Sequence, residues 1–118
     1  MPAAAGGNLG TPALVLPPLG SGGWYVLEVS SYQLETIATV GWRIGLFINL
    51  TPDHLDRYAD IDAYAAAKVR LIDGIAPGGT AIIGVDEPFG AALADTVAAR
   101  GGVTVVRVSV ERPVEGGI

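Results

Sequence analysis

Apolar residues gather in four short runs that turn residues separate, and these runs predict strands over residues 24–29, 45–50, 80–85 and 103–108. Continuous apolar runs of this length are typical of strands that are buried on both faces of a parallel sheet. Between them, apolar residues recur at helical spacing over residues 32–40, 60–74 and 88–100. The alternation predicts an α/β fold in three layers, with a mostly parallel sheet and helices on both faces.

The remaining segments carry weaker signals. Residues 1–7 are small and rich in glycine, so we expect them to be poorly ordered. A short helix is expected over residues 11–16, where Thr11 would be the N-cap and Pro12 the first helical residue. We expect a polar loop or helical turn over residues 53–58, and Pro77-Gly78-Gly79 predicts a turn.

Charge and composition narrow the class of protein. With 118 residues the chain suffices for one small domain. The chain has seven Lys and Arg residues and twelve Asp and Glu residues. The resulting net charge of −5 argues against nucleic acid or an anionic membrane as partner. The absence of cysteine excludes a disulfide scaffold and a thiolate metal site. No membrane-length apolar run or signal peptide is recognisable, so a cytoplasmic protein is expected.

Glu28 is a carboxylate at the C-terminal end of the first predicted strand. An isolated carboxylate in a dry strand is costly unless it is paired or bound to a cation. Ligands of open α/β sheets bind at this end of the strands. Glu28 is therefore either a cation ligand or a residue at the rim of the sheet in an ordinary ion pair.

The chain has one histidine and one lysine. His54 follows the second predicted strand and is either a metal ligand or an exposed loop residue. Lys68 falls within the apolar arc of its predicted helix, which includes Tyr64 and Ile72. Its stem either extends to solvent, or the amine is desolvated and can act as a nucleophile, for instance towards carbon dioxide.

Three polar residues precede or begin predicted helices. Ser30 and Gln33 stand at the head of the helix that follows Glu28, where they either contact a polar ligand or cap the helix. Asn8 lies between glycines in a tight turn, which admits a ligand close to the backbone but is a weak signal.

Four segments together resemble, in order and spacing, the central domain of the Mur ligases: residues 7–12, 27–35, 49–57 and 64–71. The motif Ser-Ser-Tyr-Gln-Leu-Glu is most similar to the sequence of the branch that adds D-glutamate to UDP-N-acetylmuramoyl-L-alanine. The branch that adds diaminopimelate or lysine shares the histidine and lysine segments and is the alternative. The resemblance implies a P-loop-type central domain and an ATP-dependent amide ligase of peptidoglycan precursor synthesis that forms an acyl phosphate.

The same resemblance implies a role for each candidate residue. Glu28 matches a ligand of the cation shared with ATP, and His54 matches a ligand of a second cation, Mg²⁺ or Mn²⁺. Lys68 matches a lysine that becomes a carbamate and reaches the second cation. Three further positions, Asn8, Ser30 and Gln33, match residues that face the UDP-muramoyl substrate.

The sequence departs from the family in one respect, because it contains no Gly-Lys-Ser/Thr phosphate loop. Residues 1–118 are therefore expected to be part of a central domain that needs the remaining domains of the ligase and cannot turn over ATP alone. Two other hypotheses are a non-catalytic module that binds the UDP-sugar or a cation, and a structural lobe whose sheet edge drives self-association.

Overall fold

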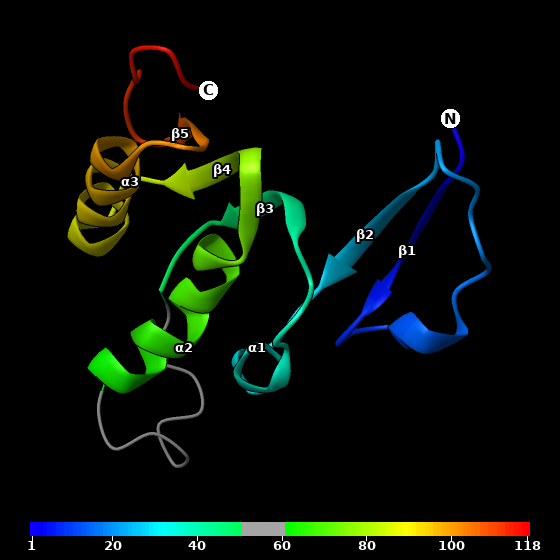
Figure 1. The fold of residues 1–118 in the computed structure, drawn as a ribbon. Coiled ribbons are helices and arrows are strands. Elements are labelled where there is room, and N and C mark those ends of the chain that lie inside the picture. The colour runs from blue at the N-terminus through cyan, green and yellow to red at the C-terminus, as the bar shows by residue number, and fades with distance from the viewer. Residues whose placement is uncertain (51–60) are drawn as a thin grey trace.

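The computed structural model describes residues 1–50 and 61–118, and it contains two parallel sheets with helices packed beside them (Figure 1). Strands β1 (Ala3–Gly7) and β2 (Trp24–Glu28) form one sheet. The second sheet has the order β3-β4-β5, built from Trp42–Phe47, Ile75–Gly84 and Thr104–Val108. The helices are η1 (a 3₁₀ turn, Ala13–Val15), α1 (Ser31–Thr36), α2 (Ile61–Asp73) and α3 (Pro88–Arg100). The predicted α/β fold with parallel strands is confirmed.

The N-terminal residues form a strand, so the expectation of poor order over residues 1–7 is wrong. Their backbone pairs with β2 from Ala3 opposite Trp24 to Gly7 opposite Glu28. Gly7 has a φ of 120°, and a Cβ there would collide with the carbonyl oxygen of Glu28. Backbone pairing rather than side-chain burial makes this strand, and a run of alanine and glycine gives no apolar signal for it.

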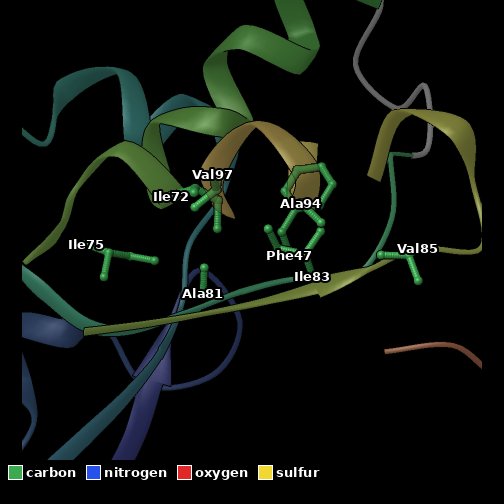
Figure 2. Packing of buried hydrophobic residues seen from close by; sticks show 8 residues of the cluster. All are labelled: Phe47, Ile72, Ile75, Ala81, Ile83, Val85, Ala94 and Val97. Atoms are coloured by element: carbon green, nitrogen blue, oxygen red, sulfur yellow. The ribbon is translucent and has the colours of Figure 1, made fainter. Parts of the chain in front are cut away.

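The main core lies on one face of the β3-β4-β5 sheet (Figure 2). Phe47 of β3 and Ile83 of β4 are opposite each other in register, and both are buried. Ile72 of α2 and Val97 of α3 pack against them. Where the sequence predicted helices on both faces, the described residues place α2 and α3 together on one, as right-handed crossovers between consecutive neighbouring strands require.

Several of the strands are half-exposed, which corrects the expectation that they are buried on both faces. In β3, Ile44 is 49% exposed and Leu46 is 53% exposed, whereas Gly45 and Phe47 between and after them are buried. Val26 of β2 is 63% exposed. An apolar run predicts a strand, but it does not say whether another segment packs against each face of that strand.

Element boundaries differ most where glycine and proline occur. Strand β4 begins at Ile75 and runs through Pro77-Gly78-Gly79, so the predicted turn is wrong. The register shifts opposite this segment, and the Gly78 amide donates to the carbonyl of Gly102 at 2.7 Å. The turn residues thus form an irregularity inside a strand rather than a chain reversal.

The helices agree better with their predictions. Helix α3 has the predicted bounds, and α2 lies inside the predicted range with Gly74 directly after it. Helix α1 is shorter than predicted and ends at Thr36. The short N-terminal helix is a 3₁₀ turn whose N-cap is Pro12 rather than Thr11. Residues 53–58 lie outside the described residues, and no described helix is long and apolar enough to cross a bilayer.

Candidate functional site

Asn8 and Glu28 lie side by side at the C-terminal ends of β1 and β2. The pairing of Gly7 with Glu28 ends the ladder, and the Asn8 amide then donates to the Glu28 carbonyl at 2.7 Å. Both residues are exposed. Glu28 is therefore not the desolvated carboxylate that the apolar run suggested, and its side chain faces solvent, where a cation can reach it.

Ser30 and Gln33 form a capping box at the start of α1. The Ser30 hydroxyl accepts from the Gln33 amide at 3.2 Å, and the Gln33 side-chain oxygen accepts from the Ser30 amide at 2.9 Å. The capping interpretation that the sequence left open thus applies to both residues. The box fixes the direction in which the chain leaves Glu28, so it also sets where these two side chains lie relative to the strand end.

Lys68 lines a pocket that residues of α1, α2 and β3 form together with the segments after β2 and β3. Its ammonium lies 4.8 Å from the ring centroid of Tyr64, one helical turn earlier and buried. The pocket has a volume of about 200 Å³, and its lining includes Asn49 after β3 and Val29 after β2. Lys68 is half-buried, so it is neither deep in the core nor fully extended to solvent. The structure thus brings the lysine to the segments that follow β2 and β3.

An arginine that the sequence analysis did not single out joins the two helices beside this pocket. The Nε atom of Arg70 on α2 donates to the carbonyl of Leu34 on α1 at 2.9 Å. Leu34 itself lines the pocket together with Lys68. The only sequence signal was an arginine in the last turn of a helix, which is common and points to no particular partner.

Two acidic residues after β4 were also missed. Asp86 accepts hydrogen bonds from the Ser109 hydroxyl and from the Val110 amide, and these bonds hold its pKa below the ordinary value of an aspartate. Glu87 accepts from the Leu50 amide at 3.4 Å, which links the start of α3 to the chain after β3. Both residues directly follow a parallel strand, where ligands of open α/β sheets bind, and this position in the sequence could have drawn attention to them.

His54 lies outside the described residues, so its predicted role as a metal ligand stays a prediction. Within residues 1–50 and 61–118 no three His, Cys, Asp or Glu side chains come together as a metal site. The Glu28 carboxylate at the end of β2 offers oxygen ligands, which fit Mg²⁺ or Mn²⁺ in their chemistry better than they fit zinc.

Comparison with known proteins places the sequence of this chain in a family. Residues 9–115 match the Mur ligase middle domain. UDP-N-acetylmuramoylalanine–D-glutamate ligase of Rhodopseudomonas palustris is 48% identical over 113 residues, which are 96% of this chain and 24% of that protein. The protein of the same name from Paramagnetospirillum magneticum is 45% identical over 119 residues, which are 100% of this chain and 26% of its own length.

A third relative of that name, from Rhizobium meliloti, is 45% identical over 96% of this chain and 24% of its own length. The chain thus spans about a quarter of the length of the curated relatives it matches. The agreement covers nearly every described element, from the turn after β1 to the end of β5. The chain belongs to the Mur ligase family, whose middle domain it matches over residues 9–115.

Proposed function

We propose that this chain is part of an ATP-dependent ligase that joins D-glutamate to UDP-N-acetylmuramoyl-L-alanine. The observation that carries the proposal is the 48% identity over nearly the whole chain to a D-glutamate ligase. In this proposal other segments of the ligase supply the phosphate loop and hold the nucleotide sugar and D-glutamate, and the reaction takes place in the cytoplasm.

The proposed chemistry is an acyl transfer in two steps. A carboxylate oxygen of the L-alanine residue attacks the γ-phosphorus of ATP, and the bond to ADP breaks to give an acyl phosphate. The amine of D-glutamate then attacks the acyl carbon, loses a proton, and expels inorganic phosphate to leave an amide. Both steps gather negative charge on phosphate oxygens, so the enzyme needs positive charge and fixed geometry at that place.

Glu28 is the residue that we assign to a Mg²⁺ or Mn²⁺ ion shared with ATP. It is an exposed carboxylate at the end of a strand. The Asn8 amide donates to the backbone carbonyl of Glu28, and this bond fixes the position of the Glu28 backbone. A bound divalent ion would neutralise part of the charge on the phosphates. This chain's contribution is to place the backbone of Glu28 at the end of β2, where the pairing of Gly7 with Glu28 ends the ladder.

Lys68 is assigned the role of a carbamate. The Lys68 ammonium would first lose a proton, and the neutral amine would then attack carbon dioxide, form an N–C bond and release a second proton. Two protons leave in all, and a cation becomes an anion. The new oxygens would join His54 as ligands of a second divalent ion. Support comes from the pocket of about 200 Å³ that Lys68 lines together with Asn49, because this volume is large enough for a molecule of the size of carbon dioxide.

Asn8, Ser30 and Gln33 are assigned to the UDP-muramoyl substrate. Asn8 is exposed beside Glu28, and the capping box holds the other two next to the same strand end. Substrate contact and capping are compatible for Gln33. Its side chain takes part in the capping box through the oxygen alone, so the hydrogens of the side-chain NH₂ group can donate to a substrate.

Genetic complementation tests the proposed function. The aligned 113-residue segment of the Rhodopseudomonas palustris ligase is replaced by this chain, and the hybrid is expressed in a strain whose own D-glutamate ligase can be switched off. We expect growth from the hybrid and from a hybrid with Arg100→Ala, an exposed residue on α3. A hybrid that accumulates at the level of the parent and supports no growth would overturn the proposal.

A further inference from the structure

The two parts of the candidate site stand on different sheets. Asn8 and Glu28 belong to β1-β2 and the turn after it, whereas Lys68 belongs to α2, which packs on β3-β4-β5. Within the described residues no backbone ladder joins β2 to β3. The spacing between the carboxylate and the lysine therefore depends on side-chain contacts that bridge the sheets.

Among residues 1–50 and 61–118, two of the contacts between these parts lie at opposite ends of the strands. At the N-terminal ends, the Arg43 guanidinium of β3 lies 4.9 Å from the ring centroid of Trp24 in β2. At the other end, helices α1 and α2 lie side by side (Figure 1), and Arg70 donates to the Leu34 carbonyl at 2.9 Å. The second bridge is the one at the pocket that Leu34 shares with Lys68.

The Leu34 carbonyl is a group that needs a partner. Helix α1 ends at Thr36, and the amide of Ile37 donates to Gln33, one residue before Leu34. A carbonyl in the last turn of a helix has no donor within the helix, and a cation is favoured there. The Nε–H of an arginine supplies both the hydrogen bond and the charge, with a planar geometry that lysine lacks.

We propose that Arg70 is a positioning residue of the ligase reaction. Its hydrogen bond to Leu34 fixes α1, and with it the Glu28 end of β2, at a set distance from Lys68, which lies two residues before Arg70 on α2. This inference rests on the proposed function. Loss of the bond loosens the packing of α1 against α2 at the edge where the reaction takes place, and the contact of Arg43 with Trp24 at the other end stays in place.

A distance measurement tests the bridge without reference to activity. This chain contributes no cysteine, so spin labels can be attached to the complete hybrid ligase, with any cysteines outside this chain replaced by serine, at cysteines placed at the exposed Ala38, after α1, and the exposed Ala66, on α2. In Arg70→Gln we expect a broader distribution of interspin distances, with an intermediate width in Arg70→Lys. The matched control Arg100→Gln, which loses an exposed ion pair, keeps the original distribution. An unchanged distribution in both Arg70 variants would refute the bridge.

Kinetics of the complete hybrid ligase test the consequence. We expect Arg70→Gln to lower kcat by roughly ten- to a hundredfold, the range that a misplacement of about 1 Å produces. The magnesium concentration for half-maximal activity should rise, the KM for the nucleotide sugar should change little, and Arg70→Lys should restore part of kcat. A role limited to stability would lower the melting temperature and leave the magnesium requirement unchanged.

The two proposals fail in different ways. A folded hybrid without substitution that shows no D-glutamate-dependent activity would refute the proposed function, and the interspin distances would still decide the bridge. An active hybrid in which Arg70→Gln keeps kcat and the magnesium requirement would refute the positioning role and leave the proposed function standing.

Discussion

The Lys68 amine lies over the ring of Tyr64, and Lys68 lines, together with Asn49, a pocket of about 200 Å³. A buried aromatic ring one turn earlier on the same helix restricts where the lysine stem can go. Small alanines precede Lys68 in the helix and leave room around the stem. Lys68 thus combines a half-buried side chain with a place in the lining of a pocket, and carbamate formation would need both.

Replacing Lys68 tests its assigned role. In the complete hybrid ligase we expect Lys68→Ala to abolish ligation, because no other lysine of this chain can supply the carbamate. Short carboxylic acids should restore part of the activity by taking the place of the missing carbamate oxygens. Intact-mass measurement should show the unsubstituted protein heavier by one carbon dioxide. Full activity of Lys68→Ala would contradict the assignment.

Asp86 predicts a dependence of stability on pH. The bonds from Ser109 and Val110 lower its pKa in the folded state, so its contribution is present above the ordinary carboxyl pKa of about 3.9 and is lost as the pH falls through the lowered value. The melting temperature of Asp86→Asn should lie below that of the unsubstituted chain at pH 7, and the gap should narrow below about pH 4.

Ser109→Ala serves as the matched variant for Asp86. It removes the hydroxyl that donates to the Asp86 carboxylate, so it should reproduce most of the loss at pH 7. The double variant should lose less than the sum of the two single losses, because the residues share one interaction. Additive losses, or a gap that stays constant down to pH 3, would show that the pair does not act in this way.

Helices followed from the sequence more closely than strands did. Helix α3 was predicted residue for residue, since Pro88 and Gly101 mark its ends and helical hydrogen bonds are local. Strands depend on distant partners, and their boundaries moved accordingly. Strand β3 begins three residues before its predicted start, and β1 had no apolar residue pattern to announce it.

The β1–β2 pair predicts that Gly7 tolerates no side chain. Gly7→Ala would force a left-handed residue to carry a Cβ and push it into the Glu28 carbonyl. We expect a loss of unfolding free energy of about 1–3 kcal/mol, measured by urea titration. Gly20→Ala is the control, because a Cβ there meets nothing within 4 Å and the change should be close to neutral. Equal stability of the two variants would contradict the described pairing.

For the molecule as a whole, the sequence indicated the fold class and the candidate residues better than it indicated their surroundings. Glu28 was singled out because its carboxylate was expected to be buried in a strand. The residue is exposed, but it lies at the C-terminal end of its strand as predicted. Arg70 was not found, because a contact between two helices depends on how the sheets are placed and no local spacing encodes it. Both outcomes follow from the same cause, which is that burial and bridging are properties of several segments at once.

The sheet face opposite α2 and α3 predicts how the 118-residue chain behaves alone. Ile44, Leu46 and Ile48 are about half exposed in one stretch of chain, and exposed apolar strands of this kind promote association. We expect the apparent mass in size-exclusion chromatography to rise with concentration and Ile44→Lys to reduce this rise. Ala66→Lys, on the surface of α2, should not reduce it. A concentration-independent monomer would contradict this expectation.

Amino-acid selectivity of the purified hybrid ligase is the decisive measurement. The enzyme is supplied with ATP, magnesium and UDP-N-acetylmuramoyl-L-alanine, and the amide product is quantified with D-glutamate, L-glutamate, diaminopimelate or lysine. We predict product with D-glutamate alone, accompanied by one ADP per amide formed. Product with diaminopimelate or lysine in place of D-glutamate, or a folded hybrid that forms no amide at all, would contradict the account.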